Sequence, residues 1–247
     1  MELLGYSERG VVNALFHEIR YSQRSNALLL ELLSLARFPF CSGPVPPSVS
    51  AAQVLLEQSF SDFGDADALL LLSNEEQRMA LFLEAKVKNA QKKNWLIEQE
   101  LDKFRRDIQK GNVSCSNLFA QLYLKVRLVK GLRACGKDEV TGCRAQVPRC
   151  FKKTTRKIGK NTIVLEAARR VRAHLGKARY IALVPGNADD IQAFFTKTLA
   201  QAGDMGLWGW DVTNWGFLAW EDVRQLCENN ALHDTLAVFD YNAGAVF

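Results

Sequence analysis

The feature that most constrains this fold is a pair of apolar runs, each of strand length, joined by a short polar segment. Residues 67–72 are apolar after the first residue, residues 79–88 are apolar except where charged residues interrupt them, and residues 73–78 between them are polar. Two strand-like runs separated in this way favour a β-hairpin. We therefore expect the chain to fold around a hairpin that belongs to its core.

Two charged residues interrupt the second apolar run. Glu84 and Lys86 are two positions apart, so on a strand their side chains point to the same face. Charges within a core cost free energy unless they are paired or bound to a metal ion. A salt bridge at the rim of the sheet is the simpler explanation for this pair on its own.

The register of the hairpin brings a third charge to the pair. If the turn is centred on the middle of residues 73–78, Asp67 lies directly opposite Glu84, whereas a shift of one residue removes this pairing. Two carboxylates so close require that one is protonated or that a cation lies between them. Two acids suit Mg²⁺, with Mn²⁺ as a substitute. In the same register Asp65 faces Lys86, so Asp65 is the second choice for the metal-bound aspartate.

A fourth charged residue, Glu8, lies at the start of a predicted helix over residues 7–21. At 100° per residue Glu8 falls inside the apolar stripe of this helix, whereas Arg9 lies well away from it. A carboxylate in line with a buried face needs a partner inside the protein. The alternative is an acid at a helix N-terminus, where the helix dipole favours it. The stripe consists of Val11, Val12, Leu15 and Ile19.

The rest of the pattern predicts a mixed α/β domain. Strands are expected at residues 53–60, 180–184 and 217–220 besides the hairpin. A further helix, over residues 26–37, is expected to be capped by Ser25. The other expected helices span residues 94–110, 117–132, 163–175, 188–202 and 221–229, and residues 134–162 are expected to be irregular.

Positive charge is concentrated in one part of the chain. The net charge is only +5, yet residues 125–179 hold 17 basic and 3 acidic side chains. Such a concentration of positive charge suits the binding of a polyanion. The alternative is a basic face that contacts only solvent. The candidates for phosphate contacts are Lys152, Lys153, Arg156, Lys157, Lys160, Arg169, Arg170 and Arg172.

The six cysteines favour reduced thiols. The spacing of Cys135, Cys143 and Cys150 lacks the C-x2-C pair that zinc ribbons usually need. Whether these three bind a metal stays open, and thiols without a role are the simpler interpretation.

The sequence resembles the PD-(D/E)XK nuclease superfamily. It shares the order of an aspartate, a hairpin and then Glu84-Ala85-Lys86, with Glu8 upstream. The opening Gly5-Tyr6-Ser7-Glu8-Arg9 is similar to the first helix of archaeal Holliday-junction resolvases, where a Glu-Arg pair follows a glycine. The resemblance covers residues 5–105. Ala66 stands where the family often has proline, and no clear Gln-x3-Tyr follows Lys86.

The resemblance implies a restriction-endonuclease-like α/β fold. Its mixed sheet would be built in the order helix, three-strand meander, helix and strand, flanked by helices and carrying a basic helical insertion. Residues 1–110 would form the first part of the nuclease core. Residues 111–179 would be the basic, cysteine-containing insertion, and residues 180–247 would complete the core.

The same resemblance implies a Mg²⁺-dependent deoxyribonuclease, an endonuclease rather than an exonuclease. Asp67, Glu84 and Glu8 would hold the metal, and Lys86 would orient the attacking water or offset charge on the phosphate. DNA is the expected substrate, ahead of RNA. The alternatives are a non-catalytic nucleic-acid-binding module that retains the fold and a regulatory protein-interaction subunit. The resemblance leaves open whether the chain forms a homodimer or a complex with a partner protein.

No run of eighteen apolar residues occurs, so a membrane span is not expected. The N-terminal residues lack the basic and then apolar order of a secretory signal. We therefore expect a cytoplasmic protein.

Overall fold

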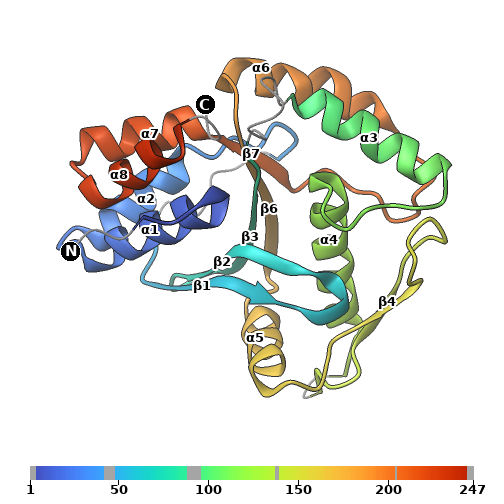
Figure 1. The fold of residues 1–247 in the computed structure, drawn as a ribbon. Coiled ribbons are helices and arrows are strands. Elements are labelled where there is room, and N and C mark those ends of the chain that lie inside the picture. Colours follow the sequence, from blue (N-terminus) through green and yellow to red (C-terminus); the bar gives the residue numbers. More distant parts are fainter. Residues whose placement is uncertain (1–3, 42–47, 88–95, 137–138, 204, 244–247) are drawn as a thin grey trace.

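A computed structural model describes residues 4–41, 48–87, 96–136, 139–203 and 205–243 of the 247-residue chain. Its centre is a five-stranded mixed sheet flanked by helices, in the strand order β1-β2-β3-β6-β7 (Figure 1). The predicted α/β class with a mixed sheet is confirmed. The strands are β1 (Ala51–Ser59), β2 (Asp65–Ser73), β3 (Arg78–Ala85), β6 (Lys177–Val184) and β7 (Trp215–Ala219).

The register of the β2–β3 hairpin agrees with the sequence prediction. Both β1–β2 and β2–β3 are antiparallel, whereas β6 pairs in parallel with both β3 and β7. Leu72 faces Met79 and Ala68 faces Leu83, so the turn is centred where the polar segment predicts it. The one-residue shift that would have separated the carboxylates does not occur.

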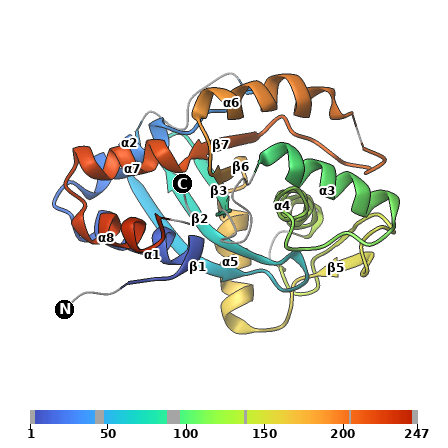
Figure 2. The same cartoon turned by 45° about the horizontal axis from the view of Figure 1, so that its top comes forward.

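Helices cover both faces of the sheet (Figure 2). Because side chains alternate along a strand, Leu70 and Leu81 pack on one face while Leu71 and Phe82 pack on the other. The first face is covered by α1 (Ser7–Tyr21), α2 (Ser25–Ser34), α7 (Trp220–Asn229) and α8 (His233–Tyr241). The second is covered by α3 (Ile97–Gln109), α4 (Leu118–Ala134), α5 (Thr162–Ala173) and α6 (Ala188–Ala193). Burial on both faces explains why the central strands are apolar throughout.

Several elements differ from the sequence prediction. Ser25 is the first residue of α2, and Arg24 takes the N-cap position without a capping hydrogen bond from its side chain. The predicted helix over residues 188–202 continues from α6 as a π-helical segment, Phe194–Leu199, and a short 3-10 turn, Ala200–Ala202. The region predicted as irregular carries two short paired strands, β4 (Arg144–Gln146) and β5 (Thr155–Lys157). Residues 94 and 95 of the predicted third helix lie outside the described residues.

The prediction of reduced thiols is wrong for two cysteines. Cys135 and Cys143 form a disulfide, with their Cα atoms 5.9 Å apart. Cys135 directly follows α4 and Cys143 directly precedes β4. Because β4 packs against α4, the two cysteines come within the usual reach of a disulfide. Cys150 is a free thiol, and burial raises its pKa. The disulfide therefore removes two of the three thiols considered as metal ligands.

Every helix in the described part of the chain is too short or too polar to cross a membrane.

Candidate active site

The candidate site lies where β2 and β3 separate. Their described ladder ends at the pair Ala68–Leu83, while β3 continues along β6 to the end of the strand. Asp67 is the next residue of β2, and its Oδ2 accepts a hydrogen bond of 2.7 Å from the backbone N–H of Ala85. A side-chain carboxylate therefore holds the two strands together just beyond the backbone ladder, which places Asp67 beside Glu84.

Asp67 is buried, with 6% of its surface exposed. Burial raises the pKa of its carboxyl above the ordinary range. The hydrogen bond from Ala85 and the charges of Lys86 and Arg9 lower this pKa, whereas the charge of Glu8 raises it. The site therefore brings the three predicted residues Asp67, Lys86 and Glu8 within electrostatic reach of one another.

Glu84 has no exposed surface, and burial raises the pKa of its carboxyl to about 7. Lys125 opposes this rise, and the neighbouring charge of Asp67 adds to it. The Nζ atom of Lys125 lies 2.9 Å from Glu84 Oε1. The second oxygen, Oε2, has no hydrogen-bond partner among the described residues. A buried acceptor left in this state is costly, so Glu84 Oε2 marks a position suited to a ligand.

Lys125 is a residue of this site that the sequence prediction missed. It lies on α4, within the segment predicted as an insertion, and α4 packs against β3 and β6. Lys125 Nζ donates to the carbonyls of Phe63 and Asp65, at 3.2 Å and 2.9 Å. Because these bonds direct two of its N–H groups, we describe its contact with Glu84 as an ion pair.

Helical spacing is the signal that could have revealed Lys125. It lies on the stripe of α4 that faces the core, where a lysine is rare unless it is paired. The other members of that stripe are Leu118, Leu122, Val129 and Leu132, and each of them is buried.

Lys86 follows β3 directly and has its backbone held on both sides. Its N–H donates to the carbonyl of Leu183 at 2.9 Å, and its own carbonyl accepts from Trp220 Nε1 at 2.7 Å. The charge of Lys86 lowers the pKa of both Asp67 and Glu84. Its ammonium is thus placed to act on both carboxylates.

The start of α1 brings Glu8 to the site from the other side. Asn242 at the end of α8 accepts from the N–H of Ser7 and donates to the carbonyl of Gly5, both at 2.8 Å. Gly5 and Gly10 touch so closely that a Cβ on Gly10 would clash with the backbone carbonyl of Gly5. Glu8 is half-buried between them. The two glycines and Asn242 therefore fix where the Glu8 side chain begins.

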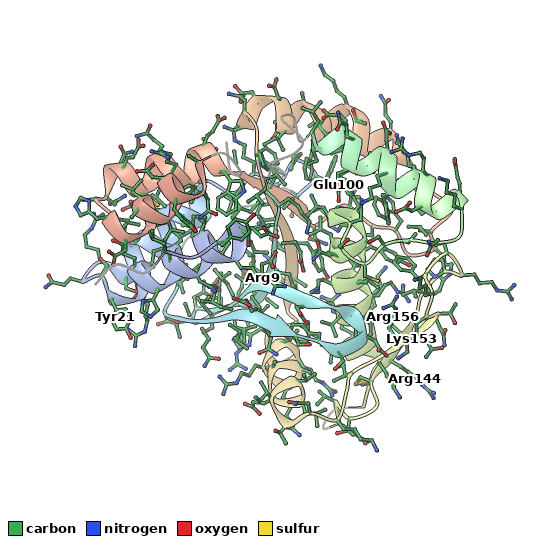
Figure 3. All side chains as sticks on the ribbon, in the orientation of Figure 1. Arg9, Tyr21, Glu100, Arg144, Lys153 and Arg156 are labelled. Carbon is green, nitrogen blue, oxygen red and sulfur yellow. A yellow bond between two sulfur atoms is a disulfide. The ribbon has the colours of Figure 1, made fainter. Side chains whose placement is uncertain are left out.

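Arg9 also belongs to the site, although the helical pattern of the sequence places it well away from the apolar stripe of α1. Its side chain, labelled in Figure 3, is 50% exposed, and its Nε atom lies 3.8 Å from Asp67 Oδ1. Its Nη1 atom lies 3.5 Å from Oε2 of Glu57. Glu57 has a φ of 48°. The β1–β2 ladder has no pair at Glu57, which its register would place opposite Asp67. A side chain on the exposed face of α1 can therefore reach the buried carboxylate of Asp67 where β2 and β3 separate.

Asp65, the second choice for the metal-bound aspartate, is exposed. Its backbone carbonyl contacts Lys125, but the β2–β3 ladder does not extend far enough to place its side chain opposite Lys86. The geometry therefore favours Asp67 over Asp65.

The predicted phosphate contacts fall into two groups. Arg156 is 7% exposed and donates to the carbonyls of Asp62 and Lys153, at 2.6 Å and 3.0 Å. Arg172 donates to the carbonyls of Cys135, Gly136 and Glu139. These two guanidinium groups hold backbone segments together, which gives them a role in the fold.

The other six predicted contacts are exposed, and three of them make local contacts. Lys153 pairs with Asp62 at 2.6 Å, while Arg169 and Arg170 pair with Glu166. Figure 3 shows Lys153 with Arg144 and Arg156 on the side of β4 and β5, next to the connection between β1 and β2. Of these six, Lys152, Lys157 and Lys160 form no ion pair with a residue that the structure describes.

The acids of the site fit a hard cation held by few protein ligands. No group of three metal-ligating side chains occurs among the described residues. Mg²⁺ commonly takes one or two carboxylates, water and a substrate phosphate. Asp67 and the unpartnered Oε2 of Glu84 supply two such oxygens. A groove between α1, α2 and β1, away from these acids, has a volume of about 620 Å³.

No protein-family model matches the chain, and comparisons with curated proteins and with solved structures find no significant match.

Proposed function

We propose that this chain is a metal-dependent nuclease that hydrolyses phosphodiester bonds within DNA. The observation that carries the proposal is the meeting of Asp67 and the buried Glu84 at the separation of β2 and β3, within reach of Lys86. Two acids and a lysine on adjacent strand ends suit the binding of a divalent cation beside a phosphate.

The order of the elements supports a restriction-endonuclease-like arrangement. Helix α1 precedes the meander of β1, β2 and β3, helices follow, and β6 then pairs in parallel with β3. This is the order implied by the resemblance to PD-(D/E)XK nucleases, and it brings the carboxyl ends of β3 and β6 to one edge. Ligands of open α/β sheets commonly bind outside the carboxyl ends of parallel strands.

Each residue of the site has a distinct part in the proposed reaction. Asp67 and Glu84 would hold Mg²⁺ or Mn²⁺, which when bound polarises a phosphodiester and lowers the pKa of a bound water. Lys86 would offset the charge that builds on the phosphate oxygens. Glu8 adds a third negative charge near Asp67 and would complete the site through water, since the described residues hold no group of three metal-ligating side chains.

The substrate would be held by exposed cations. Arg9 lies at the site itself, half exposed, and is suited to a phosphate next to the scissile one. Lys152, Lys157 and Lys160 are exposed on the basic segment and would contact the backbone farther away. Binding through such contacts does not depend on sequence, so the proposal extends to DNA in general.

A plasmid-nicking assay with Mg²⁺ tests the proposal. Lys86→Ala and Asp67→Asn should abolish cleavage while keeping DNA binding, whereas Asp65→Asn should still cleave. Lys197→Ala, at an exposed position on the π-helical segment after α6, is a matched control for the loss of a lysine. Cleavage that persists in Lys86→Ala would refute the assignment of the site.

A non-catalytic nucleic-acid-binding module is the second candidate, because Lys125 already neutralises Glu84 without an added ion. Such a module would bind DNA equally well with and without Mg²⁺ and would leave plasmid intact.

A further inference from the structure

Lys125 carries an inference about how many metal ions the site takes. Its ammonium has no exposed surface and contacts three oxygens, namely Glu84 Oε1 and the carbonyls of Phe63 and Asp65. Two of its three N–H donors bond the carbonyls, and its charge pairs with Glu84 Oε1. We propose that Lys125 takes the place of a second cation and that the Asp67–Glu84 pair binds a single divalent ion. This inference rests on the proposed function.

The backbone around Gly64 fixes the ammonium in place. Gly64 has a φ of 77°, a conformation that L-residues rarely adopt, and lies between the two carbonyls that accept from Lys125. The N–H of Phe60 donates to the carbonyl of Gly64 at 3.1 Å, which closes this loop. The two carbonyls therefore converge on one point that a buried cation fills, and α4 supplies that cation from a position packed against the sheet.

The position of Lys125 leaves one side of Glu84 for a metal. The ammonium lies 2.9 Å from Oε1, while Oε2 is buried and has no hydrogen-bond partner among the described residues. Two-metal sites hold their ions about 3.5–4 Å apart between shared carboxylates. A second ion at Oε1 would have to displace a desolvated ammonium from three oxygens, whereas an ion at Oε2 and Asp67 displaces no such group.

The wild-type protein gives the first test, with Mn²⁺ as the probe. Titration calorimetry should give one ion per chain, and the electron paramagnetic resonance spectrum should show the hyperfine pattern of an isolated Mn²⁺. Asp67→Asn should remove this binding, which assigns it to the site. Two ions per chain with a spin-coupled spectrum, both lost in Asp67→Asn, would overturn the inference.

Lys125→Met gives the second test, because it removes the ammonium and keeps an apolar chain of similar length. We expect it to bind Mn²⁺ roughly tenfold more tightly or to take up a second ion, since a full charge within about 4–6 Å shifts such an equilibrium by an order of magnitude or more. A folded Lys125→Met protein with unchanged Mn²⁺ affinity and stoichiometry would contradict the inference. If this variant does not fold, the wild-type stoichiometry and spectrum decide.

These results separate the inference from the proposed nuclease. Two coupled ions at Asp67 with Mg²⁺-dependent nicking would leave the nuclease standing and remove the single-ion site. A wild-type protein that binds no Mn²⁺ would remove both. A single isolated ion without nicking would support the metal site and contradict the nuclease.

Discussion

At the scale of single residues, the buried ion pair of Glu84 and Lys125 decides how the site behaves. Both side chains are wholly buried, and the pair joins β3 to α4 and to the loop before β2. Burial of two charges costs free energy that their attraction only partly returns. Removing one partner is then far more harmful than removing both.

We expect Lys125→Met to lower the free energy of unfolding by about 3–5 kcal/mol, because it leaves the Glu84 carboxylate buried without its cation. The double variant Lys125→Met with Glu84→Gln should recover much of this loss. Urea denaturation of the wild type and the three variants measures the difference. Additive effects of the two substitutions would show that the pair is not coupled.

The raised pKa of Glu84 predicts a pH dependence of stability in metal-free buffer. Burial raises this pKa from 4.5 to about 7, so the folded protein binds the proton more tightly than the unfolded chain does. The contribution is fully present below about pH 4.5 and is lost as the pH rises through about 7. Asp67 acts in the same direction, since burial also raises its pKa.

Thermal unfolding across this pH range measures the effect. The melting temperature of the wild type should fall relative to that of Glu84→Gln as the pH rises, because the amide does not titrate. Parallel curves for the two proteins would contradict the assignment of the shift to Glu84.

At the scale of the elements, the end of the β2–β3 ladder makes the site, and the start of α1 completes it. The hairpin register followed from the length of its polar turn, because in a hairpin the turn fixes which residues face one another. The side chain of Asp67 could be placed opposite Glu84 for the same reason. Its hydrogen bond to Ala85 could not be predicted, since it depends on the strands separating at one particular pair.

The close approach of Gly5 and Gly10 gives a prediction at this scale. Gly10→Ala should destabilise the protein by about 1–3 kcal/mol, the usual cost of forcing atoms into a packed contact. It should also reduce nicking, because the start of α1 that carries Glu8 must move. Gly136→Ala is the control, since nothing lies within 4 Å of its added methyl group. Equal melting temperatures and activities for the two variants would contradict this role of α1.

At the scale of the whole molecule, the sheet and its two helical layers follow from sequence patterns, whereas the contacts between distant segments do not. The central strands can be recognised as short continuous apolar runs, and the amphipathic helices by their local periodicity. Lys125 meets Glu84 across 41 positions of the chain, as their numbers in the sequence show, and Arg156 reaches Asp62 across 94. Such contacts depend on how layers pack, which periodicity does not specify. Helix α8 was missed for a related reason, because its docking on α1 is a tertiary contact.

Lys157 is exposed, whereas Arg156 holds backbone segments together, so variants of the two residues should give different results. Lys157→Ala should weaken DNA binding uniformly across sequences and lower the slope of log affinity against log salt by about 0.9 for each lost phosphate contact. Arg156→Gln should instead lower the melting temperature, because its guanidinium joins the basic segment to the connection between β1 and β2. Fluorescence anisotropy with a labelled duplex at several salt concentrations measures the first effect. An unchanged salt slope for Lys157→Ala would remove that residue from the interface.

A crystal soaked in Mn²⁺ tests the central claim most directly, because the anomalous signal of the ion reveals its ligands. The account predicts one Mn²⁺ bound by the carboxylates of Asp67 and Glu84, with Lys125 still in contact with Glu84. Mn²⁺ found only elsewhere in the molecule, with the pair of Glu84 and Lys125 unchanged, would contradict it.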